Sequence, residues 1–269
     1  MRRSVTALLL LTVSTAAYAH DLFLKLSDYF VAPDSAVKVA VLNGTFSTSE
    51  NYITRDRLRD VSLASGGGRT KVDTAAWTPA PGNKSGFVTV RVGRSGTYVL
   101  GASTLPRELK LPAKDFNAYL KDEGLGDMLA RREREGDLDK PSNERYHKHV
   151  KAIFQVGDQR TDDYAVTLGY PAEIVPARNP YLLTVGHDLV VRCLLDGRPA
   201  PNAVVLAGGR TRGGERIPVQ TVRADAQGQA TVKLSTTGVW YVKFVSMEKA
   251  DHDGLTHESK WATLTFGVK

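Results

Sequence analysis

The sequence predicts an all-β protein, with two antiparallel Ig-like β-sandwich modules joined by a short, partly helical segment. Three observations predict this fold. Apolar and polar residues alternate over most of the chain, turn residues separate the alternating runs, and helical spacing is confined to one stretch near the middle. Turns this regular, without helical patterns between the strands, favour sandwiches over β-α-β units.

The first 19 residues have the pattern of a secretory signal peptide. Arg2 and Arg3 precede an apolar run at 5–13, and small residues follow, ending in Ala-Tyr-Ala at 17–19. The apolar run is much shorter than the roughly 18 residues that a membrane-spanning helix needs. We therefore expect a periplasmic protein, cut directly before His20, with no stable insertion in the membrane after the cut.

The composition is that of an ordinary globular protein, with 42% hydrophobic and 24% charged residues. The formal charge of +7 becomes +5 without Arg2 and Arg3. Both signs are mixed along the chain, as in 131–135, which is typical of a solvated helix face rather than a nucleic-acid-binding stripe. We therefore expect no nucleic-acid partner.

The chain contains a single cysteine, so it can form no internal disulfide. Cys193 alternates in phase with Val191 and Leu195 and is expected to be a small core residue on a strand.

The N-terminal module is expected over 20–105 and the C-terminal module over 164–269. In the first, alternation and turns predict strands at 37–41, 59–64, 87–92 and 97–100. In the second, they predict strands at 189–195, 204–206, 230–234, 239–245 and 261–268.

The connecting segment, 106–163, is expected to contain both helix and strand. Apolar residues recur at helical spacing from 113 to 137, and Gly124 and Gly126 favour two short helices over one. A period of two then predicts a strand at about 146–156, with its apolar side inward and its polar side outward, joining one of the two sheets.

The expected polar side of this strand carries His147 and His149. Strand geometry places their Cα atoms about 6 to 7 Å apart, pointing the same way. Two imidazoles on one strand face can share a metal ion, so both are candidate ligands. The alternative is a polar outer face on which two histidines occur by chance.

As first residue of the mature chain, His20 would carry an α-amine as well as an imidazole. The two groups can close a chelate ring around one metal ion, and the amine pKa of about 8 lets a metal displace its proton. The alternative is that His20 is only the residue at which the peptidase cuts.

The loop at 251–258 contains two histidines and three carboxylates. His252 and His257 are candidate ligands, because imidazole and carboxylate together suit nickel, copper, zinc or cobalt. The alternative is a solvated hairpin loop. His187, after Gly186, is expected to belong to a turn.

Several stretches resemble a bacterial family of unknown function that is often described as a NikM-like periplasmic component of nickel or cobalt uptake. The matching stretches are 19–24, 116–120, 123–125, 144–151, 156–157, 179–181, 196–199, 238–243 and 261–266. The resemblance implies an exported β-sandwich that handles a divalent transition metal and possible contact with a membrane metal transporter.

The resemblance extends to His20, which matches the family's histidine after the signal peptide. It does not extend to His147 and His149. Ser246 stands where many relatives are expected to have histidine, which leaves the remaining ligands open.

No catalytic motif is found, so an enzyme is not expected, although copper redox chemistry at a terminal histidine stays open. Two function classes follow. The first is a periplasmic protein that binds nickel, cobalt or copper and supports its uptake or handling. The second is a non-catalytic β-sandwich module that binds a protein or glycan partner.

Overall fold

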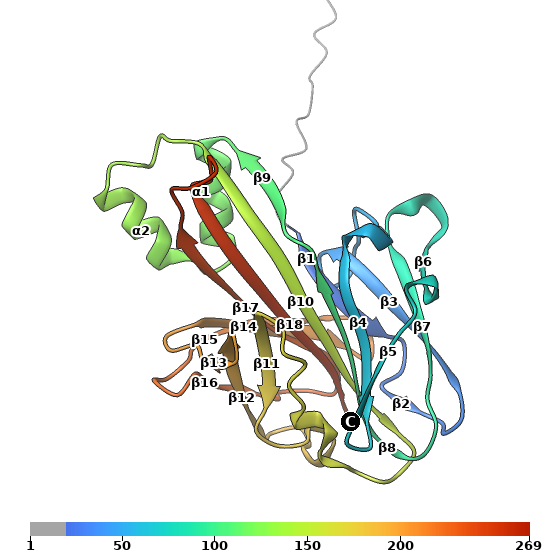
Figure 1. Cartoon of the computed structure of the whole chain (residues 1–269). Helices are drawn as coiled ribbons and strands as arrows, with labels where there is room; N and C mark the ends of the chain where they lie inside the picture. The colour runs from blue at the N-terminus through green and yellow to red at the C-terminus, as the bar shows by residue number, and fades with distance from the viewer. Residues whose placement is uncertain (1–19) are drawn as a thin grey trace, which may run out of the picture.

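Residues 20–269 form three β-sheets and two short α-helices (Figure 1). The structure is a computed structural model that describes residues 20–269, and the expected signal peptide at 1–19 lies outside the described residues. The all-β prediction, with Ig-like sandwiches and a partly helical segment, is confirmed. None of the helices in the described part is long and apolar enough to cross a membrane.

The N-terminal sheet has the strand order β1-β3-β7-β6. Its strands are β1 (Asp21–Leu26), β3 (Ala36–Gly44), β7 (Gly86–Arg91) and β6 (Trp77–Pro79). The C-terminal sheet has the order β11-β12-β13, with β16 also paired to β12. Its strands are β11 (Ala172–Pro176), β12 (Asp188–Leu195), β13 (Arg198–Pro199) and β16 (Gln229–Lys233).

The central sheet lies between the other two and has the order β15-β14-β17-β18-β10-β8-β4-β5. The strands of this path are β15 (Arg216–Arg223), β14 (Val204–Thr211), β17 (Gly238–Lys249), β18 (His257–Val268), β10 (Ser142–Val156), β8 (Gly96–Thr104), β4 (Leu58–Ser65) and β5 (Gly68–Lys71). Two further strands, β2 (Phe30–Val31) and β9 (Arg107–Leu111), pair with β10.

Strand β10 joins the two halves of the chain. One edge pairs in parallel with β18, and the other pairs antiparallel with β8 and β9. Because β18 comes from the C-terminal half and β8 from the N-terminal half, the two sandwiches share one sheet, an arrangement that the sequence does not predict. The parallel pairing of β10 with β18 also departs from the expected antiparallel pattern.

Both faces of β10 are covered. Val150 and Phe154 belong to the core against the N-terminal sheet, and Ile153 on the other face belongs to the core against the C-terminal sheet. The expected outward polar side is therefore wrong for His149 and Lys151, which are each 2% exposed. The C-terminal sheet covers this side.

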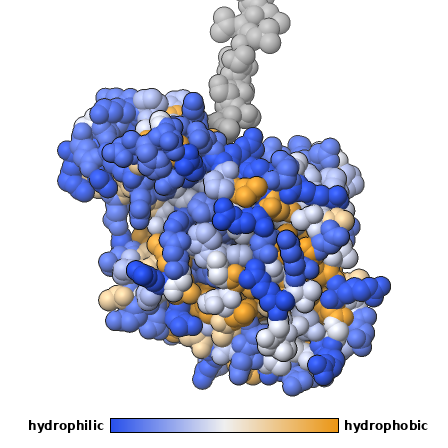
Figure 2. All heavy atoms as spheres, viewed as in Figure 1, coloured by the Kyte–Doolittle hydropathy of each residue, from blue (hydrophilic) through white to orange (hydrophobic). Residues whose placement is uncertain are grey.

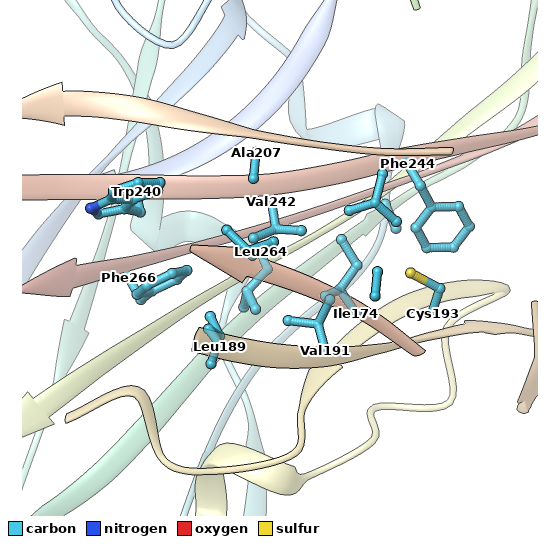
Figure 3. Packing of buried hydrophobic residues seen from close by; sticks show 14 of the residues in the cluster. Ile174, Leu189, Val191, Cys193, Ala207, Trp240, Val242, Phe244, Leu264 and Phe266 are labelled. Carbon is cyan, nitrogen blue, oxygen red and sulfur yellow. The ribbon is translucent and has the colours of Figure 1, made fainter. Parts of the chain in front are cut away.

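The C-terminal core is the larger of the two and packs tightly around aromatic side chains (Figure 3). Trp240 and Phe266 belong to the same buried cluster as Leu189 and Val191 of β12, and Trp240 is fully buried. Cys193 lies in the same core with no exposure, which confirms the expected core cysteine, and burial raises the pKa of its thiol to about 12. Burying such side chains supplies the main stabilisation of a chain without a disulfide.

Helices α1 (Ala113–Asp122) and α2 (Gly126–Arg134) pack against β17 and β18 at one end of the central sheet. The prediction of two short helices is confirmed. Gly124 separates them with a φ of +74°, which favours glycine. Phe116, Tyr119 and Leu120 bury one side of α1 against Trp261. The outer surface of this helical lobe is mostly hydrophilic in Figure 2.

All nine strands that the sequence predicts in the two modules are found, together with the strand at 146–156. Several others are missed, and β1 is the most important of them. Leu22, Leu24 and Leu26 alternate with Phe23 and Lys25, but both faces of β1 are partly apolar, which hides the period of two.

Candidate functional site

Strand β1 fixes the start of the described chain. It is an edge strand of the N-terminal sheet, and Leu22 and Leu24 are buried. Two threonines of β18 reach its free edge, because Thr263 Oγ1 donates to the Leu22 carbonyl at 2.8 Å and Thr265 Oγ1 donates to the Leu24 carbonyl at 2.5 Å. The carbonyl groups along this edge would otherwise be buried without hydrogen bonds, and side chains of the central sheet supply the missing donors.

A third side-chain hydrogen-bond donor reaches the backbone carbonyl of His20, which precedes β1. Lys148, on β10, donates from Nζ to the His20 carbonyl and to Asn43 Oδ1, the latter at 3.0 Å. The lysine is almost fully buried and forms no ion pair with any described residue. Burial lowers its pKa to about 8, with the Asp21 carboxylate opposing the shift. Lys148 therefore holds the backbone of His20 in place.

The imidazole of His20 is oriented by a carboxylate. Its Nε2 lies 2.8 Å from Oε2 of Glu50. Burial lowers the pKa of His20, although the Glu50 charge opposes this, so the neutral imidazole donates its Nε2–H to Glu50. Nδ1 has no hydrogen-bond partner among the described residues. Histidines that bind metals usually donate their second ring nitrogen in this way.

A second lysine connects the neighbouring residue to helix α1. Lys243 Nζ lies 2.5 Å from Asp21 Oδ2 and 2.7 Å from Glu123 Oε2. Burial raises the pKa of Glu123 to about 7, and the nearby Asp21 charge adds to the shift. Burial alone would lower the pKa of Lys243, but the two carboxylates raise it. The ion pairs hold the end of α1 against the start of β1.

A cavity of about 250 Å³ opens beside His20. Phe23, Phe46 and Tyr241 form one wall, with ring centroids 5.0 to 5.3 Å apart. The other lining side chains are polar or aromatic and include Asp21, Asp122, Glu123 and Tyr119. Oδ1 of Asp21 is buried without a partner among the described residues. The cavity leaves room for an ion and its solvent ligands next to His20.

No three His, Cys, Asp or Glu side chains converge on a common point anywhere in 20–269. A metal ion at His20 would therefore depend on the main chain for a donor. The α-amine of a terminal His20 supplies one, since amine and Nδ1 close a six-membered ring with the ion.

His147 and His149 point the same way, as the sequence predicts. Their rings are 4.7 Å apart, and Nε2 of His149 lies 3.0 Å from Nδ1 of His147. The other nitrogen of His149 contacts Ser103 Oγ at 2.9 Å. Burial lowers the pKa of both imidazoles, that of His149 to about 3, so both are neutral at neutral pH.

The structure does not bring His252 and His257 together. His252 is exposed in the loop, with Nε2 3.7 Å from Glu258. The prediction that His257 lies in the same loop is wrong. It is the first residue of β18 and is 1% exposed. Its ring packs on Phe116, on the opposite side of the strand from Glu258. His187 lies exposed in a turn with Thr184, as expected.

Sequence reasoning missed Glu50, Asn43, Lys148 and Lys243. Lys148 carried a weak signal, since a lysine between two histidines on a strand points to the face that the apolar residues occupy. Glu50 lies in a loop with no motif around it, and nothing in the sequence indicates its contact with His20.

The chain is thus an all-β protein of several sheets, whose N-terminal strand carries a histidine held by a carboxylate and a buried lysine. It belongs to the family described as a domain of unknown function (DUF4198), whose model matches residues 17–248. No curated protein matches it.

Several solved structures are similar over most of this chain at low identity. A tetra-tandem repeat of a large adhesion protein is 12% identical, with 92% of this chain and 49% of that chain covered and a TM-score of 0.23. Trypsin-activated α-2-macroglobulin from Escherichia coli is 11% identical, with coverages of 94% and 16% and a TM-score of 0.24. This chain thus spans about half of the first and about a sixth of the second.

Proposed function

We propose that the chain is exported to the periplasm, is cut directly before His20, and there binds a divalent transition-metal ion whose uptake or handling it supports. The observation that carries the proposal is the 2.8 Å contact between His20 Nε2 and Glu50. It fixes the tautomer in which Nδ1 is free to chelate together with the α-amine.

The position of the cut agrees with the packing of β1. Cleavage before His20 leaves the buried Leu22 and Leu24 in the mature chain, whereas a cut further on would remove them from the core. The hydrogen bond from Lys148 to the His20 carbonyl holds the new terminus beside its imidazole and the cavity.

The donor set favours nickel, cobalt or copper. An amine and an imidazole nitrogen suit these borderline ions, and the affinity order of first-row metals places copper highest. The resemblance to the NikM-like family supports nickel or cobalt and a membrane metal transporter as partner. Because the amine pKa is about 8, a bound ion competes with a proton, and affinity rises with pH.

Isothermal titration of nickel, cobalt and copper into the mature protein tests the proposal. His20→Ala keeps the α-amine and removes the imidazole, so we expect affinity to fall by more than tenfold, about 1.4 kcal/mol. Glu50→Gln keeps the chelating atoms and weakens their orientation, so we expect a loss of about tenfold.

Glu215→Gln is the matched control, since Glu215 is an exposed acid whose side chain makes no hydrogen bond or ion pair among the described residues. Its affinity should equal that of the parent. Equal affinities of the parent, His20→Ala and Glu50→Gln would contradict the proposal and favour a non-catalytic module that binds a protein or glycan.

A further inference from the structure

The histidine pair of β10 lies outside the His20 site. His147 and His149 alternate with Lys148 along the strand, so they project from the face opposite to the one that holds His20. Their facing nitrogens, Nδ1 of His147 and Nε2 of His149, are 3.0 Å apart, and the ring planes are inclined by 84°.

This separation matches two ligands of one metal ion. Imidazole nitrogens bind such ions at about 2.0 to 2.1 Å, and two of them 3.0 Å apart subtend about 95° at the ion. An angle near 90° between neighbouring ligands is that of square-planar and octahedral coordination, which copper(II) and nickel(II) favour. The tetrahedral angle of zinc would place the nitrogens about 3.3 Å apart.

A buried hydroxyl supports the pair from behind. Ser103 has no exposure, and its Oγ lies 2.9 Å from Nδ1 of His149. A metal-binding histidine needs such a partner for its second nitrogen, because the partner fixes the ring and its tautomer. Tyr170 packs beside the same ring at 5.8 Å, which restricts the orientation of His149 further.

The protons of the pair balance when an ion binds. Without an ion, the two contacts are satisfied when His149 donates Nε2–H to His147 Nδ1 and accepts the Ser103 hydroxyl proton at Nδ1. With an ion, the His149 proton resides on Nδ1 and is donated to Ser103 Oγ, which turns from donor to acceptor. Both imidazoles stay neutral, no proton is released by the pair, and both nitrogens present lone pairs to the ion.

The pair can be reached from solvent through His147, whereas His149 is buried behind it. His147 lines a cavity of about 380 Å³, whose other polar side chains include Asp196, Ser246, Glu258 and Lys260. Asp196 is paired with Lys260 at 2.5 Å and Glu258 with Arg145 at 3.5 Å, whereas Glu248, which also lines the cavity, has no ion pair among the described residues. No third His, Cys, Asp or Glu of residues 20–269 groups with the two histidines, so water in the cavity is left to complete the coordination of an ion that they hold.

We propose that His147 and His149 form a second metal site, for copper(II) or nickel(II), which is separate from His20 and accessible through this cavity. It goes beyond the proposed function, because it requires neither the α-amine nor removal of the signal peptide.

Copper(II) titration in a His20→Ala background tests this site without the first one. We expect the mature His20→Ala protein to bind one equivalent, and a further His147→Gln change to weaken that binding by more than tenfold. His147 is only half-buried, so its replacement disturbs the fold less than that of His149. His187→Gln in the same background is the control and should leave binding unchanged.

Imidazole NMR signals give a second measurement. Substoichiometric copper(II) should broaden the ring signals of His147 and His149 before those of the exposed His252. The proposal is overturned if His20→Ala binds no copper, if His147→Gln leaves its affinity unchanged, or if His252 broadens first. A His20→Ala protein that still binds one equivalent of copper(II) but binds less than the parent bears on the first site only, so the two proposals fail separately.

Discussion

Lys148 is a buried amine that is held by two neutral carbonyl oxygens, those of His20 and the Asn43 side chain. Burial lowers its pKa to about 8, well below the ordinary 10.5. Between these values the unfolded chain carries a proton that the folded chain lacks. Stability at this residue therefore rises as pH increases from about 8 to 10.5, and below pH 8 the buried charge costs about 3 kcal/mol.

We predict that Lys148→Met removes this part of the pH dependence. Urea unfolding at several pH values from 7 to 10.5 should show a smaller rise in unfolding free energy for the variant than for the parent. The variant should also bind metal at His20 more weakly, because the His20 carbonyl loses its donor. If the unfolding free energies of the parent and the variant changed by the same amount over this pH range, Lys148 would not be the source of the pH dependence.

Among single residues, the sequence identifies His20 as a candidate ligand and predicts that the side chains of His147 and His149 point the same way. It does not predict their partners. Lys148 lies 128 residues from His20, and Glu50 comes from a loop, so both contacts depend on how the N-terminal sheet packs against β10. Local pattern fixes which way a side chain points along its own strand, but not what it meets there.

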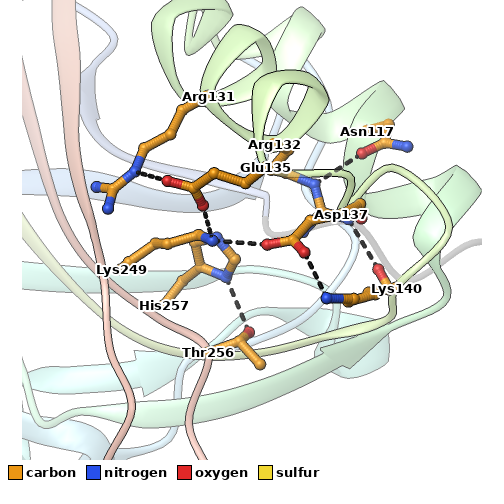
Figure 4. Close-up of polar contacts among 9 residues, drawn as sticks. All are labelled: Asn117, Arg131, Arg132, Glu135, Asp137, Lys140, Lys249, Thr256 and His257. Atoms are coloured by element: carbon orange, nitrogen blue, oxygen red, sulfur yellow. Dashed lines mark hydrogen bonds and ion pairs between the residues drawn. The ribbon is translucent and has the colours of Figure 1, made fainter.

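The helical lobe is held to the central sheet by ion pairs around a buried histidine (Figure 4). Lys249 on β17 pairs with Glu135 and with Asp137, the latter at 2.6 Å. Beneath them, His257 packs on Phe116 at 4.6 Å, with Nδ1 bonded to Thr256 and Nε2 unpartnered among the described residues. Burial lowers the pKa of His257 to about 4, and the nearby Arg132 charge adds to the shift.

Because the ordinary pKa of histidine is 6.5, the unfolded chain takes up a proton at His257 between pH 6.5 and 4 that the folded chain does not. Stability should fall by up to about 3 kcal/mol as pH decreases through this window. We predict that His257→Phe, which keeps the ring packing, removes this loss. Thermal unfolding at pH 7, 5.5 and 4 measures it, with His187→Phe as the exposed control.

An equal loss of stability in the His257→Phe variant and the parent would assign the acid sensitivity to other groups. His149, whose pKa is also low, is unchanged in both proteins and so cancels from the comparison.

Among the elements, the sequence predicts those with a clear period. The strands of the N-terminal sheet at 37–41 and 87–92 alternate in burial because each has one face in a core, whereas 97–100 and 261–268 are buried on both faces and are found from their turns and β-rich composition. The missed β1 and the misjudged second half of β10 are both apolar or buried on two sides, so alternation no longer reports exposure. His257 was placed in a loop because acidic neighbours on both sides conceal the start of β18.

The whole molecule has one continuous central sheet, to which both halves of the chain contribute strands. Removing either half would expose an edge of β10 and one of its faces. The sequence cannot show this, because the pairing of β10 with β18 joins strands about a hundred residues apart and no local signal specifies it.

We predict that the molecule unfolds in one cooperative transition. Trp77 reports on the N-terminal core and Trp240 on the C-terminal core, and both are fully buried. Variants that keep only one of these tryptophans, with Phe at the other and at Trp261, should give the same denaturant midpoint by fluorescence as by circular dichroism. Two separate midpoints would show independent modules.

The proposed metal site at His20 is created only when the chain is cut before this residue. The most direct measurement is isothermal titration of nickel and copper into two forms of the protein, one beginning at His20 and one with an additional alanine before it. The extension turns the amine into an amide and leaves every side chain in place. We predict at least tenfold weaker binding to the extended form, about 1.4 kcal/mol, with unchanged melting of the metal-free proteins. Equal affinities would contradict it.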